Sequence, residues 1–102
     1  MAGEILEEAN EIPNLEERRS RLLEQARLNP DSPLPHYLVG KTYEYEGKDE
    51  EAIRSYETAL EIQPTCGPCH QALGKLLFRK KKRVEAQVHL RKAELFSPSA
   101  PE

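Results

Sequence analysis

The chain repeats itself with a period of about 34 residues, and this period restricts the fold more than any other feature of the sequence. When residues 33–66 are aligned with residues 67–98, small, apolar or proline residues coincide at several positions. The coinciding pairs are Gly40 and Gly74, Tyr43 and Leu77, Ala52 and Ala86, Tyr56 and Leu90, Ala59 and Ala93, and Pro64 and Pro98. Such a period indicates one supersecondary unit used twice, with each unit burying the apolar face of its neighbour.

The residue pattern inside each unit predicts a pair of helices. Small residues such as Gly40 and Ala52 recur where two helix backbones would approach closely, and larger apolar residues fill the space between them. Pro64 stands at the end of the apolar pattern, where proline ends a helix. No run of residues shows the period-2 alternation of a strand. We expect helices at about 34–46, 49–62, 67–80 and 83–96.

A further helix is expected at about 14–28, ahead of the two units. Asn14 is a suitable N-cap with an acid three residues on, at Glu17. The apolar residues expected on one face of this helix are Leu15, Leu22, Leu23 and Ala26. The helix would be the second half of a degenerate leading repeat, and residues 3–11 are either the stub of its first half or a frayed end.

The first unit carries a recognisable set of residues. It contains Leu38-Val39-Gly40-Lys41-Thr42-Tyr43 and then Ala52, Tyr56, Ala59 and Pro64. This arrangement resembles the tetratricopeptide repeat, in which Gly, Tyr, Ala, an aromatic residue, Ala and Pro recur at those spacings. The unit departs from the family at His36, where Trp is preferred. The second unit has Lys81 in place of the usual turn glycine, which Gly47 supplies in the first.

The resemblance implies an all-α fold, namely a short right-handed superhelix of antiparallel helix pairs with about two full repeats and a degenerate N-terminal half-repeat. We expect residues 1–102 to form a single domain. Its expected parts are a leading helix at 14–30, repeats at 33–66 and 67–98, and a tail at 99–102.

The two ends of the chain differ in charge and in the expected exposure of apolar residues. The net charge is −3 over residues 1–30, −5 over residues 31–66 and +5 over residues 67–102. Tetratricopeptide arrays usually close with a helix that is polar outside, and residues 97–102 cannot form one. We therefore expect an open apolar edge on the last helix pair, through which the chain would form a homo-oligomer or dock to another protein.

Three residues near the start of the second unit allow a different chemistry. Cys66-Gly67-Pro68-Cys69 spells a thiol redox motif, and His70 completes the spacing of a haem attachment site or three ligands of a zinc site. The chain lacks the βαβ framework of thioredoxins, and a Gly-Pro pair is also what a turn into a helix needs. A thiol-redox or metal-binding protein using Cys66, Cys69 and His70 is the alternative to an interaction module.

The sequence favours a protein that binds another protein. We expect no enzyme, because no nucleophile and base stand in a recognisable arrangement, and no cofactor. The basic run Arg79–Arg83 has few aromatic neighbours, so it indicates a solvated turn more than a nucleic-acid site. The N-terminus has no secretory pattern and no apolar stretch spans a membrane, so we expect a cytoplasmic location.

The family resemblance implies that the first helix of each pair lines a concave groove for a peptide. Carried over residue by residue, it places Tyr37, Lys41 and Tyr45 in the groove from the first unit and Gln71, Lys75 and Phe78 from the second. Two lysines beside aromatic residues suit a segment with an acidic residue or a terminal carboxylate. The expected partner is therefore another protein or peptide of that character.

Overall fold

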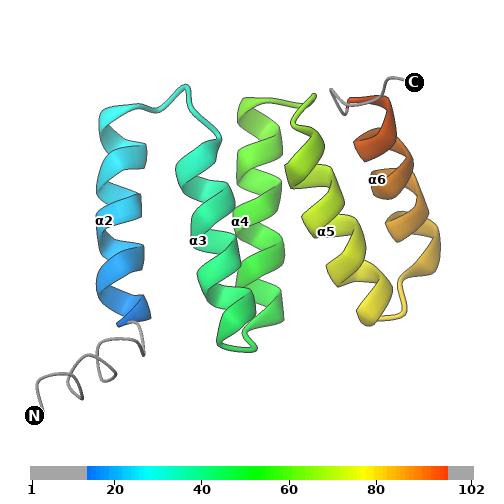
Figure 1. The fold of residues 1–102 in the computed structure, drawn as a ribbon, viewed down its shortest axis with the longest axis horizontal. Helices are drawn as coiled ribbons and strands as arrows, with labels where there is room; N and C mark the ends of the chain where they lie inside the picture. Colours follow the sequence, from blue (N-terminus) through cyan, green and yellow to red (C-terminus); the bar gives the residue numbers. More distant parts are fainter. Residues whose placement is uncertain (1–13, 97–102) are drawn as a thin grey trace, which may run out of the picture.

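The structure is a computed structural model that describes residues 14–96, and these residues form five α-helices and no strand (Figure 1). The helices are α2 (Leu15–Leu28), α3 (Leu34–Tyr45), α4 (Asp49–Ile62), α5 (Gly67–Arg79) and α6 (Arg83–Leu95). They stand side by side in chain order, each running back along its predecessor (Figure 1). The expected all-α fold is confirmed, and each expected helix begins and ends within about one residue of its predicted position.

Both helix pairs use a glycine to bring their helices together. A Cβ atom on Gly40 would lie 2.5 Å from Cε1 of Tyr56, and one on Gly74 would lie 2.8 Å from Cδ2 of Leu90. Tyr56 and Leu90 are themselves equivalent in the repeat alignment, so the two glycines occupy equivalent environments. The two units therefore repeat in space as the sequence predicts.

The turn inside each pair also repeats. Gly47 follows α3 with a φ of 79°, and Lys81 follows α5 with a φ of 65°. Both values lie in the left-handed region, which glycine enters without the steric cost that a side chain brings. Lys81 therefore adopts the backbone of the missing glycine, and the departure from the family pattern leaves the shape of the turn unchanged.

The core lies between the two repeats. Tyr56 of α4 is fully buried, and Ala52 and Ile53 lie beside it. Leu73 and Leu76 of α5 complete the same cluster from the other side. Because both repeats contribute to one core, neither buries its apolar face without the other.

The leading helix α2 is joined to the first repeat by a buried arginine. Arg19 donates from Nη1 to Thr42 Oγ1 at 3.1 Å and to Glu46 Oε1 at 3.0 Å, and its guanidinium lies 4.1 Å from the ring centre of Tyr43. Ala26, two turns further along, is buried on the same face of α2. A hydrogen-bonded and charge-paired arginine is the form in which such a group tolerates burial.

One apolar residue on the face predicted for α2 is largely exposed. Leu23 is 46% exposed, whereas Ala26 beside it is buried. Leu23 stands four residues after Arg19 and three before Ala26, so it lies at the border of the same face, where solvent reaches part of its side chain.

The far end of the array differs in part from the expectation of an open apolar edge. Ile53 and Leu60 of α4 pack on the core shared with α5. The equivalent residues of the second repeat are Gln87 and Glu94 of α6, and both are polar and exposed. Val84, Val88 and Leu95 of α6 are exposed, but their spacing puts them on another face of the helix.

Parts of the sequence prediction fall outside the described residues. They are the first half of the leading repeat at 3–11, the end of the second repeat at 98 and the tail at 99–102. Among residues 14–96, no helix has the length and apolar character needed to cross a lipid bilayer.

Candidate functional site

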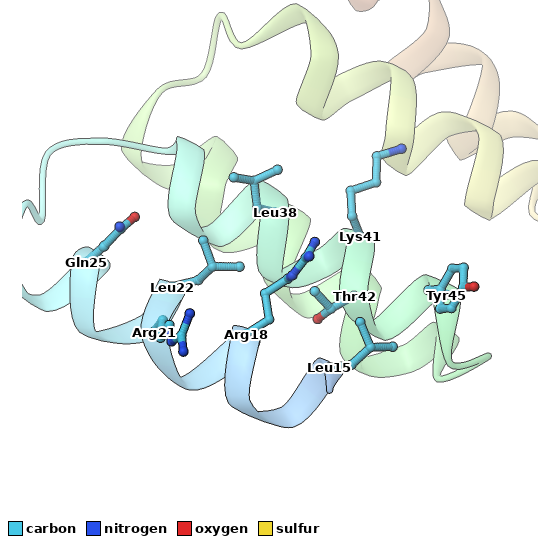
Figure 2. Close-up of a pocket in the computed structure, with 9 residues that line it drawn as sticks. All are labelled: Leu15, Arg18, Arg21, Leu22, Gln25, Leu38, Lys41, Thr42 and Tyr45. Atoms are coloured by element: carbon cyan, nitrogen blue, oxygen red, sulfur yellow. The ribbon is translucent and has the colours of Figure 1, made fainter. Parts of the chain in front are cut away.

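A groove with a volume of about 600 Å³ lies between α2 and α3. All of its lining residues come from these two helices (Figure 2). From α2 they are Leu15, Arg18, Arg21, Leu22 and Gln25, and from α3 they are Leu38, Lys41, Thr42 and Tyr45. The volume falls within the range of binding pockets for peptides and small molecules.

The groove exists because α2 keeps the register of a second repeat helix while α3 belongs to the following repeat. Arg18, Leu22 and Gln25 stand one repeat period before Ala52, Tyr56 and Ala59. In the first repeat these later residues are buried, and Tyr56 closes tightly on Gly40 of its partner helix α3. Within residues 14–96, α2 has no such partner helix on that side, so its larger side chains border an open groove.

The charges around the groove are positive. Arg18, Arg21 and Lys41 line it, and among residues 14–96 no carboxylate does. Arg21 Nη2 is paired with Glu17 Oε2 at 2.8 Å, whereas Arg18 and Lys41 are paired with no carboxylate among residues 14–96. Lys41 Nζ lies 5.5 Å from the ring centre of Tyr37, which is within the range of a cation–π interaction. The groove therefore offers cations around an apolar floor.

The six residues predicted for the peptide groove are distributed over two helices. Lys41 and Tyr45 of α3 line the groove just described. Tyr37 is half-buried instead, and its ring centre lies 5.9 Å from that of Tyr56. Tyr37 therefore packs against the core in addition to its contact with Lys41. The remaining residues, Gln71, Lys75 and Phe78, lie exposed on α5.

A polar network connects the first helices of the two repeats. Glu44 of α3 accepts a hydrogen bond from the Tyr56 hydroxyl at 2.6 Å through one carboxylate oxygen. Its other oxygen accepts from Arg79 Nη1 of α5 at 3.0 Å. Burial and the neighbouring Glu44 carboxylate raise the pKa of Tyr56 far above its usual value, so the hydroxyl stays a hydrogen-bond donor. The network fixes α5 beside α3 on the side that carries Lys41 and Lys75.

The sequence model of the tetratricopeptide repeat matches residues 33–66, the span of α3 and α4. Residues 33–66 are a tetratricopeptide repeat. The match starts and ends where the first repeat was predicted, and the second helix pair copies its geometry at Gly74 and Lys81.

Solved structures of MamA share the arrangement of the repeats. A crystal structure of MamA superposes with a TM-score of 0.76 at 26% identity, covering 83% of this chain and 50% of that one. The MamA R50E mutant gives a TM-score of 0.66 at 27% identity over 76% of this chain and 57% of that one. MamA from Desulfovibrio magneticus RS-1 gives a TM-score of 0.74 at 23% identity. That match covers 90% of this chain and 52% of that one. This chain thus spans about half the length of these structures. No curated protein sequence matches it.

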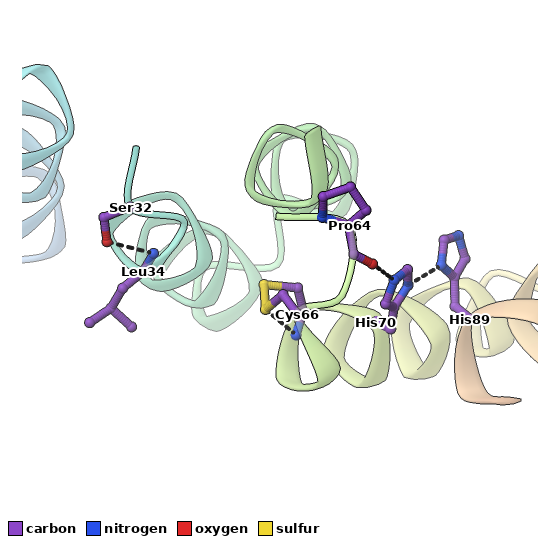
Figure 3. The surroundings of a disulfide bond; sticks show 7 residues. Ser32, Leu34, Pro64, Cys66, His70 and His89 are labelled. Carbon is purple, nitrogen blue, oxygen red and sulfur yellow. Dashed lines mark hydrogen bonds between the residues drawn. A yellow bond between two sulfur atoms is a disulfide. The ribbon is translucent and has the colours of Figure 1, made fainter. Parts of the chain in front are cut away.

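The cysteine pair at the start of the second helix pair has a structural role there. Cys66 and Cys69 form a disulfide across the first turn of α5, and Cys66 Sγ accepts a hydrogen bond from the backbone N–H of Cys69 at 3.1 Å (Figure 3). The preceding repeat starts in a similar way, because Ser32 Oγ accepts from the backbone N–H of Leu34 at 3.4 Å. Ser32 and Cys66 are one repeat period apart, so the sulfur and the hydroxyl stand at equivalent positions, although only Cys66 is the N-cap of its helix.

His70 belongs to the core rather than to a metal site with these cysteines. Its Nε2 lies 2.8 Å from the carbonyl oxygen of Pro64, and its Nδ1 lies 2.9 Å from Nδ1 of His89 (Figure 3). A carbonyl oxygen only accepts, so the tautomer that fits both contacts has the proton on Nε2 of His70, and its Nδ1 then accepts from Nδ1–H of His89. Among residues 14–96, no group of three or more His, Cys, Asp or Glu side chains is placed to hold a metal.

The basic run at the end of α5 contributes contacts between the repeats. Arg79 is paired with Glu44 and Asp49, and Lys80 Nζ lies 3.3 Å from Glu50 Oε2. Lys81 forms the left-handed turn described above. Part of this run therefore holds the two repeats together.

Sequence reasoning missed the arginines of α2. Arg18 and Arg21 line the groove, and Arg19 between them is buried. The sequence did indicate a shared face, because Leu15, Arg18 and Leu22 are spaced three and four residues apart and so lie on one side of the helix. Aligning the leading helix with the second helix of the repeat would have placed these residues opposite α3.

Proposed function

We propose that this protein is a non-catalytic interaction module that binds a peptide segment of another protein, in which one or two acidic residues stand beside an apolar side chain. The bound segment would lie in the groove between α2 and α3 and continue toward α5. The apolar side chain would contact Leu22 and Leu38, and the acidic residues would pair with Arg18 and Lys41.

The observation that carries the proposal is the unbalanced charge of the groove. Arg18 and Lys41 stand at an apolar surface without a carboxylate partner among residues 14–96, and no acid lines the groove. Cations in such a place give a ligand of opposite charge both orientation and a faster association rate. Tyr45 adds an exposed aromatic ring at one end, and aromatic residues often dominate the energy of interfaces.

The tetratricopeptide repeat itself favours this class of function, because such repeats generally bind other proteins. The network of Glu44 and Arg79 supports an extension of the site along α5, since it brings the helix that carries Lys75 next to the helix that carries Lys41. Gln71 and Phe78 would then contact the far part of a longer segment.

The proposal is tested with a fluorescent peptide of about ten residues that contains two Glu next to a Leu and a Phe, against the same peptide with Gln in place of Glu. We expect the acidic peptide to bind more tightly by a factor of about 10, because two charge-assisted pairs are lost with Gln. Fluorescence anisotropy measures both affinities. Equal affinity of the two peptides contradicts the proposed role of the cations.

Charge-reversed variants locate the site. Arg18→Glu and Lys41→Glu should each weaken the binding of the acidic peptide about 10-fold. Arg54→Glu makes the same charge change at an exposed position of α4 outside the groove and should have little effect. Lys75→Glu tests how far the site extends, because a loss there means that the peptide reaches α5. Unchanged binding by the Arg18 and Lys41 variants, with helicity intact, contradicts the proposal.

The thiol or metal chemistry that the sequence left open is not favoured by any contact described above. Changing both cysteines to Ser should leave peptide binding unaltered, because the disulfide lies at the start of α5, away from the groove between α2 and α3. The cytoplasmic location stays a prediction, and disulfides are rare in that reducing compartment.

A further inference from the structure

The groove between α2 and α3 lies where the repeat pattern has another helix. In the first repeat, α4 is fully buried at Ala52, Tyr56 and Ala59, and Tyr56 closes on α3. The equivalent face of α2 borders the groove instead. Residues 1–11 stand one repeat period before residues 35–45 of α3. The order of the chain therefore points to these residues as an occupant of the groove.

The residues ahead of α2 are acidic and apolar. Residues 1–13 contain four glutamates and no Lys, Arg or His. The glutamates are Glu4, Glu7, Glu8 and Glu11, and the large aliphatic residues among them are Ile5, Leu6 and Ile12. In the run Ile5-Leu6-Glu7-Glu8, two acids directly follow two aliphatic side chains. This is the composition that we proposed above for a ligand of the groove.

The groove has the complementary character. Leu22 and Leu38 supply apolar side chains, and Arg18 and Lys41 line the same hollow (Figure 2). Neither of these two cations is paired with a carboxylate among residues 14–96. Arg21 also lines the groove and is paired with Glu17. A purely acidic segment with aliphatic side chains therefore matches the groove in both charge and polarity.

The segment is also attached at the right place. Pro13 precedes the N-cap Asn14, and the next residue, Leu15, lines the groove. The groove follows α2 from Leu15 to Gln25, a length of about 15 Å at the rise of a helix. Ten residues span about 15 Å as a helix and about 33 Å when extended. Residues 3–12 can therefore reach the whole groove from its own border.

The fit differs from that of a full repeat at its closest contact. In the first repeat, Gly40 lets Tyr56 approach so closely that an added Cβ atom would lie 2.5 Å from the ring. One repeat period earlier, these two positions are occupied by Leu6 and Leu22. Two leucines keep their backbones further apart than a glycine facing a side chain does. Residues 3–12 would therefore be held less tightly than α3 is held against α4.

We propose that residues 3–12, which we call the leading segment, occupy the groove between α2 and α3 of their own chain when no partner is bound. Its aliphatic residues would contact Leu22 and Leu38, and its glutamates would pair with Arg18 and Lys41. A partner peptide must then displace the leading segment, which makes the segment an internal competitor. This regulation rests on the function proposed above, since it concerns the same groove.

The size of the effect follows from the short connection. A segment joined to its site by a few residues is present there at an effective concentration of about 1 mM. An intramolecular contact with an intrinsic dissociation constant of about 0.1 mM would then fill the groove about nine-tenths of the time. An external peptide would bind about 10-fold more weakly than it does to a free groove.

The leading variant removes the charges of the segment and keeps the chain at full length. It carries Glu4→Gln, Glu7→Gln, Glu8→Gln and Glu11→Gln. The acidic fluorescent peptide described above should bind this variant about 10-fold more tightly than the wild type. A matched control makes the same change in net charge at exposed residues of α4 and α6 that form no ion pair among residues 14–96, and it should bind like the wild type. Its substitutions are Glu57→Gln, Glu61→Gln, Glu85→Gln and Glu94→Gln.

A synthetic peptide of residues 3–13 tests the segment as a ligand. It should bind the leading variant at least about 10-fold more tightly than the wild type, whose groove is filled. Adding Lys41→Glu to the leading variant should weaken this binding about 10-fold. Circular dichroism checks that each variant keeps its helices.

Cross-linking identifies the chain from which the occupant comes. Among the described lining residues only Lys41 carries an amine, and a carbodiimide joins an amine to a carboxylate that lies against it. Mass spectrometry of the wild-type monomer should find Lys41 joined to a glutamate of the leading segment. If this link occurs only in cross-linked dimers, the segment fills the groove of a second copy and the proposal is overturned.

The remaining outcomes separate this proposal from the proposed function. If the external peptide binds the wild type and the leading variant equally, and Lys41→Glu weakens both, the function stands and the internal competitor is overturned. If only the peptide of residues 3–13 binds the leading variant, the internal contact stands and the proposed function fails. If neither peptide binds the folded leading variant, both proposals are overturned.

Discussion

In the first repeat, an aromatic ring holds the two helices at their closest approach, and in the second an aliphatic side chain does so at the same place. Tyr56 lies against Gly40, is fully buried, and is tied by its hydroxyl to Glu44. Leu90 lies against Gly74, is only half-buried, and has no such bond. The comparison teaches that the backbone of this fold requires a small residue facing a larger one, while rigidity depends on what the larger one is.

The starts of the two repeats differ in a similar way. Ser32 accepts a hydrogen bond from the backbone before α3, and Cys66 does so before α5 and is also covalently bonded to Cys69. The position equivalent to Cys69 is Pro35, which restricts the first turn through its ring. Each repeat thus stiffens its first turn, one through a ring and the other through a disulfide.

The largest difference in stability between the repeats is expected when each contact glycine is replaced by alanine. Gly40→Ala should lower the free energy of unfolding by about 2–3 kcal/mol, because the new methyl group meets a buried, hydrogen-bonded ring that cannot move aside. Gly74→Ala should cost less, about 1 kcal/mol, because a new rotamer of Leu90 and the helix preference of alanine offset part of the clash, while the Leu90 backbone nitrogen at 3.2 Å from the new Cβ must still shift slightly. Urea unfolding followed by circular dichroism measures both.

A double-mutant cycle sharpens this prediction. In a Tyr56→Leu background the first repeat has the side chain of the second, so most of the penalty of Gly40→Ala should disappear. If Gly40→Ala and Gly74→Ala cost the same in the wild-type background, the proposed difference in rigidity is wrong.

Exchanging the turn residues Gly47 and Lys81 should change the free energy of unfolding by a smaller amount, with opposite sign in the two repeats. Lys81→Gly should stabilise the protein by about 1 kcal/mol, because a side chain in the left-handed conformation is strained and glycine is not. Gly47→Lys should destabilise it by about the same amount. The double exchange should lie near the wild type, and thermal unfolding measures all three. Destabilisation by Lys81→Gly would mean that the lysine side chain contributes more than its backbone strain.

The smallest effect is expected from pH and should belong to the second repeat. Burial, and after it the adjacent His70 and Lys92, lower the pKa of His89 from 6.5, whereas Glu85 opposes the shift. The folded state therefore binds fewer protons here than the unfolded state, so this contribution to stability is complete above about pH 6.5 and is lost as the pH falls below it. We expect the unfolding temperature to fall between about pH 7.5 and 5.5.

The first repeat provides the control for this pH effect. Ser55 stands one repeat period before His89, so His89→Ser gives the second repeat the residue of the first. The variant should unfold with a smaller dependence on pH than the wild type. Since carboxylates also titrate near the lower end of this range, the comparison between the two proteins is decisive. Identical slopes would show that His89 contributes nothing.

The fold could be predicted from the sequence because its determinants are local and periodic. The regular spacing of Gly40 and Gly74 identified the helix contacts, and prolines marked the helix ends. Even Lys81 was predicted to take the place of a glycine. These features depend on which residues fit a turn or a close helix contact, and neighbouring residues decide that.

The candidate site was harder to predict because it depends on a missing neighbour. Lys41 and Tyr45 were recognised through the family resemblance, but Arg18 and Arg21 line the groove only because no helix covers that side of α2 among residues 14–96. Arg19 was missed for another reason. In the sequence it looks like an ordinary exposed arginine, because the carboxylate, hydroxyl and aromatic ring that surround it belong to residues far along the chain. Partners distant along the chain decide such burial.

The polar residues of α6 also matter for any repeat stacked beyond it. Gln87 and Glu94 occupy the places where Ile53 and Leu60 of α4 hold the next repeat, so α6 lacks the apolar side chains for the same contact. Fusing an extra repeat to its end would therefore leave a polar seam. A longer designed array from this scaffold would require Ile and Leu to be restored at those two positions first.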